Sequence, residues 1–173
     1  MKYFRVKLED GQQIFLDGDR AGIAYLIDEG QIRLHKKHEG KEIEIDIIGP
    51  GQIFGELGVI SDSNRMASAT AIGKTTLTGC HRREIMERVN GLSDDWREAL
   101  RFLITYCQEF LPYELMDTRS DTPETIDMDD TAHKLIIKAQ KPDALSELEP
   151  FMQGLYNVLI GYAKRRLPPS LEC

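Results

Sequence analysis

Short runs of apolar and β-branched residues fill the first part of the chain, and turn residues separate them. Turn dipeptides such as Asp10-Gly11 and Glu29-Gly30 lie between runs of five to seven residues, namely FRVKL, QQIFL, IAYLI, QIRLHK, EIEIDII and TTLTG. Many short runs at this spacing predict an antiparallel β sandwich or jelly-roll barrel over residues 1–80. The strict alternation of KEIEIDI predicts a strand with one face in water and the other on the core.

The apolar period changes to that of a helix after residue 80. HRREIMERVN, residues 81–90, predicts a charged hinge helix that Asn90-Gly91 ends. Ser93 then caps a second predicted helix, 94–111, and its apolar residues recur along one face: Trp96, Leu100, Leu103, Cys107 and Phe110. We expect 81–112 to form hinge and lid or dimer helices, whose apolar face packs on the barrel and can also pair with its twin in a homodimer.

The last third of the chain differs in composition from the rest. Residues 113–130 are acidic and poor in apolar groups, which predicts an exposed linker. Helical patterns return in 131–173, where Pro142 and Pro150 occupy positions that a first helical turn tolerates. The predicted class is therefore mainly β with α: an antiparallel β jelly-roll barrel followed by C-terminal helices, the last of them forming a helical appendage over 131–173.

The composition of the chain argues against DNA binding, membrane insertion and metal binding. The 173 residues carry a formal net charge of −7 with a pI near 5.2, so DNA is not an expected partner. No apolar run reaches the ~20 residues of a membrane span, and Met1–Leu8 lacks a signal-peptide core, so we expect a cytoplasmic protein with no membrane association. The three cysteines and four histidines lack metal-ligand spacing, so neither a metal nor a cofactor is expected.

The stretch FGELGVISDSNRMASATA, residues 54–71, holds an acid and an arginine apart among small residues. One interpretation is a solvated loop whose charges do nothing. The other is a site for a phosphodiester beside a hydroxyl. A carboxylate such as Glu56 accepts a hydrogen bond from a hydroxyl, and an arginine such as Arg65 holds an anion together with backbone N–H groups at a helix start. Glycine and alanine let the chain approach such a ligand closely.

Residues 15–79 resemble the cyclic nucleotide-binding domain of catabolite activator proteins, kinase regulatory subunits and nucleotide-gated channels. The segment FGELGVISDSNRMASA is similar to the phosphate-binding cassette of that family, and FLDGDRAGIAYLIDEGQIRL and GPGQIFGEL match the strands and turns before it. The resemblance implies a cyclic nucleotide ligand, with Glu56 and the Gly55 backbone at the ribose 2′-hydroxyl and the Arg65 side chain at the cyclic phosphate. It also implies that backbone groups complete the anion site, at Leu57, Gly58, Met66 and Ala67.

Two positions depart from the family pattern. Asn64 stands where proline usually precedes the arginine, and Met66 stands where channels that favour cGMP often carry threonine. Methionine offers no hydroxyl to a guanine, so of cAMP and cGMP we expect cAMP. An alternative is a vestigial cassette that binds no nucleotide, in which Glu56 and Arg65 pair with each other and the barrel serves protein interaction.

Two interpretations of the function of the whole chain remain open at this point. The first is a regulatory module that binds a cyclic nucleotide, cAMP by preference, and signals through its C-terminal helices to an unknown protein partner or to its own dimer. The second is a transcription regulator of the catabolite-activator type with a divergent or reduced DNA-binding end, since no helix-turn-helix is recognisable after the linker. We do not expect an enzyme, because a cupin-like jelly roll needs clustered His and Glu ligands that this chain lacks.

Overall fold

The computed structural model describes residues 2–38 and 40–92, and beyond them only Asp94, Arg97, Leu100, Arg101, Gln153, Gly154 and Asn157. The chain divides into two compact units, Met1–Gly91 and Leu92–Cys173, and nearly all described residues belong to the first. The predicted linker and most of the predicted helix 94–111 and appendage 131–173 lie outside the described residues.

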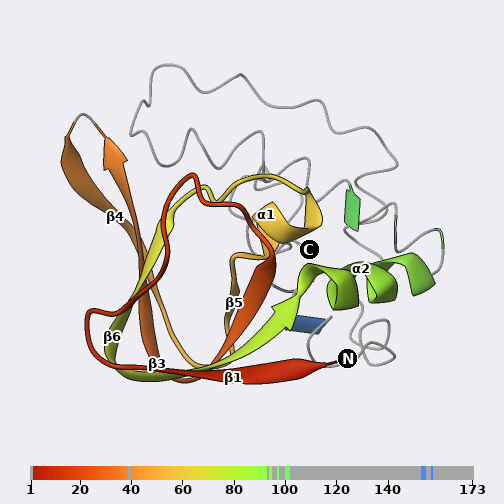
Figure 1. Cartoon of the computed structure of the whole chain (residues 1–173), viewed down its shortest axis with the longest axis horizontal. Coiled ribbons are helices and arrows are strands. Elements are labelled where there is room, and N and C mark those ends of the chain that lie inside the picture. Colours follow the sequence, from red (N-terminus) through yellow and green to blue (C-terminus); the bar gives the residue numbers. More distant parts are fainter. Residues whose placement is uncertain are drawn as a thin grey trace, which may run out of the picture. The chain divides into compact units, whose positions relative to one another are not determined.

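The first unit is built from antiparallel strands that curve around a common interior, with one short helix inserted and one helix at the end (Figure 1). The strand order is β1-β6-β3-β4, while β2 pairs with β6 and β5 pairs with β3. The mainly β, antiparallel class predicted from the sequence is confirmed. The elements are β1 Tyr3–Leu8, β2 Gln13–Phe15, β3 Ile23–His38, β4 Lys41–Ile48, β5 Ile53–Phe54, α1 Glu56–Ile60, β6 Ser68–His81 and α2 Arg82–Gly91.

The turn expected at Glu29-Gly30 is not a turn. The runs IAYLI and QIRLHK form one long strand, β3, and the register against β6 shifts on both sides of Glu29. Gly30 has a φ of +85°, which a glycine adopts without strain, so the strand bends here while its pairing continues. The predicted strand TTLTG likewise extends in both directions into β6.

The alternation expected of β4 is also interrupted. Leu34 and His35 of β3 oppose Asp46 and Glu44, so Ile45 is an extra residue without a partner and forms a bulge. The isoleucines on either side of the bulge, Ile43 and Ile47, are 38% and 45% exposed, so neither is buried in the core. The prediction that alternate residues of this strand all face the core was therefore wrong.

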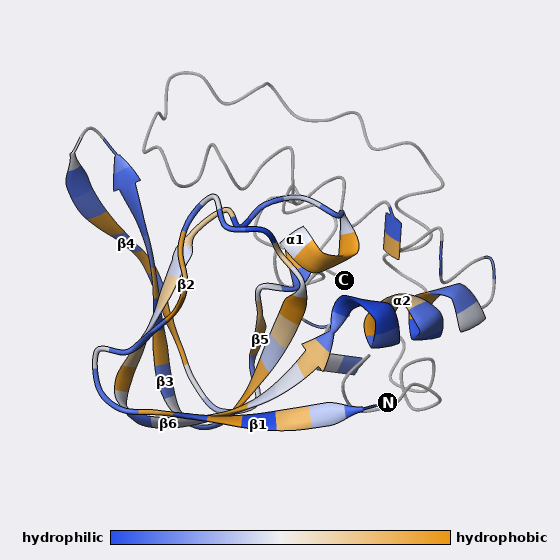
Figure 2. Cartoon of the chain, in the orientation of Figure 1, coloured by the Kyte–Doolittle hydropathy of each residue, from blue (hydrophilic) through white to orange (hydrophobic). Residues whose placement is uncertain are grey.

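The core lies between β3, β4, β5 and β6, with side chains of Phe15 and neighbouring residues packed against it. Its buried members are Tyr25, Ile27, Ile32, Ile48, Phe54, Ala69, Ala71 and Leu77. Helix α2 follows β6 directly and agrees with the helix predicted over 81–90. It is mostly hydrophilic (Figure 2), and it buries Ile85 and Val89.

Gly30 offers a test of the bend in β3. A Cβ at this position would lie 2.4 Å from Thr75 Oγ1 and 2.6 Å from the Lys74 carbonyl oxygen. Gly40 has a similar φ of +78°, but a Cβ there would have no atom within 4 Å. Alanine at either site bears a left-handed backbone cost of about 1–2 kcal/mol, and crowding adds a further ~1–3 kcal/mol at Gly30 alone.

We therefore expect Gly30→Ala to lower the melting temperature clearly more than Gly40→Ala, because about 1 kcal/mol shifts a domain of this size by roughly 4–8 °C. Thermal unfolding followed by circular dichroism measures the difference. Equal losses in the two variants would mean that β3 and β6 do not approach at this bend.

Candidate functional site

Helix α1 begins at the predicted glycine and carboxylate. Gly55 is its N-cap with a φ of +74°, and all five helical residues, Glu56–Ile60, are buried. A glycine cap has no side chain to offer, and no side-chain hydrogen bond caps this end. The helix therefore begins with an acid at its entrance.

Arg65 is buried beside this helix, and its backbone holds it there. Its N–H donates to the Asp19 carbonyl at 2.8 Å, and its own carbonyl accepts from the Gly18 N–H at 2.9 Å. The side chain points to α1 and β3: Nη1 donates to the Gly55 carbonyl and Nη2 to the Ile23 carbonyl, each at 2.6 Å. The arginine and the start of α1, ten residues apart in sequence, are thus joined directly.

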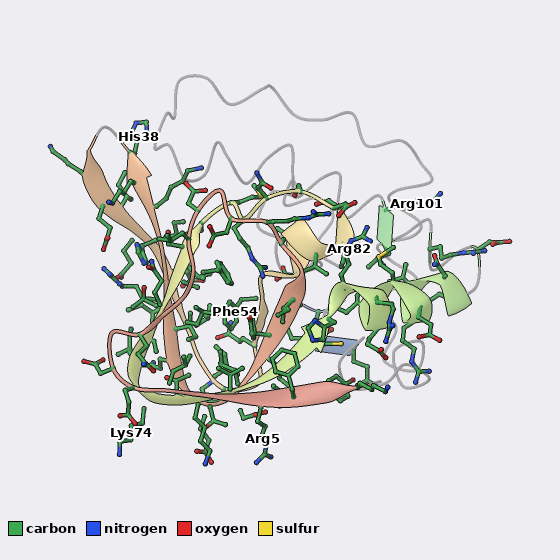
Figure 3. The ribbon with its side chains drawn as sticks, viewed as in Figure 1. Arg5, His38, Phe54, Lys74, Arg82 and Arg101 are labelled. Atoms are coloured by element: carbon green, nitrogen blue, oxygen red, sulfur yellow. The ribbon has the colours of Figure 1, made fainter. Side chains whose placement is uncertain are left out.

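One face of the Arg65 guanidinium lies on an aromatic ring. The guanidinium carbon is 4.0 Å from the centroid of Phe15, a cation–π contact. Phe15 in turn belongs to a group of three rings with Tyr25 and Phe54, whose centroids are 5.4–6.3 Å apart. Figure 3 places Phe54 in the interior of the strands. Two backbone carbonyls and a ring therefore fix both the position and the plane of the guanidinium.

Glu56 is buried, and few hydrogen bonds or charges replace the water that its carboxyl loses. The residue is 2% exposed, and its Oε1 has no hydrogen-bond partner. Burial raises the pKa of this carboxyl to about 7, although a hydrogen bond from its own backbone N–H and the charge of Arg65 oppose the rise. Near neutral pH the group is therefore poised between its neutral and charged forms.

Arg65 is incompletely paired as well. Its Nε is buried and has no hydrogen-bond partner, and burial lowers the pKa of the guanidinium against the opposing effects of Tyr25, Glu56 and Asp19. Among the described residues, Glu56 Oε1 and Arg65 Nε are the buried side-chain atoms left without partners. Buried polar atoms are rarely left so, and each case requires an explanation.

The predicted site residues are brought together, but not as an ion pair. Glu56 and Arg65 do not hydrogen-bond to each other, because the arginine donates to backbone carbonyls instead. This argues against the alternative in which the two charges satisfy each other. Leu57 and Gly58 lie in the buried α1, whereas Met66 and Ala67 are half-buried in the segment that leads into β6.

Sequence reasoning missed the partners of Arg65. From the sequence, Phe15 is indistinguishable from an ordinary core position of a strand, and the carbonyl of Ile23 carries no sequence signal at all. Only the folded chain places them on the arginine. Within the described residues there is no cluster of His, Cys, Asp or Glu fit to hold a metal ion, and none of their helices has the length and apolarity to span a bilayer.

Comparison with known proteins places this geometry in context. Residues 5–89 match the family model of the cyclic nucleotide-binding domain. The Cyclic AMP receptor protein of Thermus thermophilus is 33% identical over 94 residues, which span 53% of this chain and 44% of that protein. The cAMP-dependent protein kinase type II regulatory subunit of Drosophila melanogaster is 37% identical over 65 residues, 38% of this chain and 17% of that protein. The chain thus spans less than half the length of either relative.

A solved structure supports the same fold. The EAL enzyme Bd1971 in its cAMP and cyclic-di-GMP bound form superposes with a TM-score of 0.59 at 28% identity, over 63% of this chain and 29% of that one. The same enzyme has also been solved in a cGMP bound form.

The raised pKa of Glu56 predicts how stability depends on pH. Between pH 4.5 and about 7 the unfolded chain has lost this proton while the folded chain keeps it, so folding stability falls as the pH rises through this window. Across this window the group lowers the free energy of unfolding by about 3 kcal/mol, because its pKa rises from 4.5 to about 7 and one pKa unit corresponds to about 1.4 kcal/mol.

Glu56→Gln, which stays neutral, should remove this part of the pH dependence and make the ligand-free domain more stable than the wild type at pH 8. Urea unfolding at pH 5 and pH 8 measures the difference, and Glu44→Gln on the exposed surface of β4 is the control. A Glu56→Gln profile parallel to that of the wild type would show that the carboxyl is ionised without cost in the fold.

Proposed function

Because residues 5–89 belong to the cyclic nucleotide-binding domain family, we propose that the group formed by Gly55, Glu56 and Arg65 binds a cyclic mononucleotide and that the chain is a regulatory module. The observation that carries the proposal is the pair of buried atoms without partners, Glu56 Oε1 and Arg65 Nε. One lacks a hydrogen-bond donor and the other an acceptor. A ribose hydroxyl beside a cyclic phosphate offers one of each.

The ribose contact follows from the chemistry of Glu56. Its free oxygen lies at the entrance of α1 and can accept the 2′-hydroxyl hydrogen. A hydrogen bond to an ionised carboxylate is about twice as strong as one between neutral groups. The ligand would therefore favour the charged carboxylate and compensate the desolvation that raises its pKa without ligand.

The phosphate contact follows from what remains free on Arg65. A guanidinium has five N–H donors, and the Gly55 and Ile23 carbonyls receive one from each terminal nitrogen. The Nε–H and the second hydrogens of the terminal nitrogens remain for phosphate oxygens. Because Phe15 already fixes the plane of the fork, little side-chain entropy is lost on binding. In this proposal the backbone N–H groups of Leu57, Gly58, Met66 and Ala67 complete the anion site.

The proposal takes cAMP as the preferred ligand over cGMP. Met66 has no hydroxyl to offer a guanine, and two of the relatives are named for cyclic AMP. The proposal also takes the chain as a cytoplasmic module that catalyses no reaction of its own. Ligand binding would be signalled from α2 to the C-terminal helices. From there the signal would reach a protein partner, or a second copy of the chain through helix 94–111. A transcription regulator with a reduced DNA-binding end is the alternative output.

Calorimetric titration with cAMP, cGMP and a cyclic dinucleotide tests the proposal. Arg65→Ala leaves a buried phosphate charge unpaired, which typically costs on the order of 2–5 kcal/mol. Affinity for cAMP should then fall by roughly 30-fold to several-thousand-fold, since about 1.4 kcal/mol corresponds to a factor of ten.

The matched control is Arg33→Ala, which removes an arginine paired with Glu42 on the β3–β4 hairpin and should leave affinity unchanged. If the wild-type protein binds none of the three ligands, the cassette is vestigial. If it binds cAMP and both variants bind as tightly as it does, Arg65 does not hold the phosphate.

A further inference from the structure

One arginine outside the proposed ligand site contacts the end of the ligand-site helix. Arg82 is the first residue of α2, and its Nε donates to the Val59 carbonyl in α1 at 2.9 Å. The same Nε lies 3.3 Å from Oδ1 of Asp62, in the turn that follows α1. Figure 3 shows Arg82 at the start of α2, on the side of α1.

This contact supplies what α1 lacks. The helix has no basic residue in its own last turn, although its C-terminal carbonyls lack intrahelical donors. A cation that donates to a last-turn carbonyl stabilises a helix end. Val59 is fully buried, so its carbonyl has no ready replacement for the Arg82 donor in water. The contact therefore links Arg82 to Val59, which lies 23 residues earlier in the chain. Through α1 it also connects Arg82 with Glu56, which lies 26 residues earlier.

Asp62 is held in place for this role. It is the one non-glycine residue with positive φ, +56°, in the part of the chain that the structure describes. Asparagine and aspartate tolerate this conformation better than most residues. The turn is tied back to α1, since the Ser61 N–H donates to the Leu57 carbonyl and the Ser63 N–H to the Gly58 carbonyl. A shift of α1 would therefore move Asp62 with it.

A second connection runs through the backbone. The Arg82 N–H donates to the Gly22 carbonyl at 2.9 Å. The neighbouring Ala21 packs so closely on α1 that a Cβ at Gly58 would lie 2.7 Å from its Cβ. Arg82 is thus connected to α1 in two ways, through its side chain and through its backbone. A substitution of Arg82 removes the side-chain connection and leaves the backbone hydrogen bond in place.

We propose that Arg82 is a positioning residue that couples α1 to α2. Through this side chain, a ligand bound at the entrance of α1 changes how readily the backbone hydrogen bonds of α2 open. The inference rests on the proposed function and names the contact by which that site would reach the rest of the chain. Arg83, its neighbour, provides the contrast: its side chain is 81% exposed and, among the described residues, pairs with Glu84.

Hydrogen exchange of the amides of α2, with and without saturating cAMP, tests the coupling in the full chain. In the wild type and in Arg83→Gln, cAMP should slow exchange across 82–91 by a similar factor. In Arg82→Gln, cAMP should still bind, within about tenfold of the wild-type affinity, but its effect on α2 should fall to less than half. Asp62→Asn keeps the backbone conformation and the Val59 bond and should give an intermediate effect.

Calorimetry on the same samples separates the two proposals. If the wild type binds no cyclic nucleotide, the proposed function fails and this inference fails with it. If cAMP binds Arg82→Gln and still slows α2 exchange as fully as it does in Arg83→Gln, binding stands and the coupling role of Arg82 is overturned. Should Arg82→Gln fold poorly, Asp62→Asn tests the ion pair by itself, and a full wild-type response there overturns the part of the coupling assigned to the Arg82–Asp62 pair.

Discussion

The placement of the Arg65 guanidinium is the constraint on which the rest of the site depends. Its terminal nitrogens join the Gly55 carbonyl at the start of α1 to the Ile23 carbonyl at the start of β3, and Phe15 of β2 covers its face. Three separate segments therefore meet on one charged group. A buried cation is costly unless it is well paired, so this arrangement also fixes the entrance of α1, where Glu56 is buried.

At Glu56, folding stability is opposed to the proposed function. A buried carboxyl with an unpaired oxygen destabilises the folded state at neutral pH, and a neutral residue of similar shape would not. The cost is explained if a ligand supplies the missing donor, because the same desolvation then strengthens the new hydrogen bond. Arg82 stands at the opposite end of the same five-residue helix. In the proposed coupling, a change at the Glu56 end of this short helix reaches Arg82 at the other end.

The sequence was sufficient to predict the elements that local patterns specify and the residues that carry charge. The antiparallel β class and the helix after residue 80 both follow from turn chemistry and periodicity. Failures came where tertiary pairing overrides local signals. The Glu29-Gly30 pair looks like a turn but bends a continuous strand, and Ile45 bulges because β3 pairs around it. The contact of Phe15 with the arginine depends on strand packing alone. That Glu56 and Arg65 bind a nucleotide stays a prediction.

The central claim is that the buried Glu56 carboxyl receives a ribose hydroxyl, and the protons released on binding test it most directly. Titration with cAMP at pH 7 in two buffers of different ionisation heat, Tris and PIPES, measures that release. A carboxyl with a pKa of about 7 is half protonated there, so its ionisation on binding should release up to about half a proton. The release should be absent in Glu56→Gln. Tight binding with the same heat in both buffers would contradict the account, because the carboxyl would then keep its proton beside the ligand.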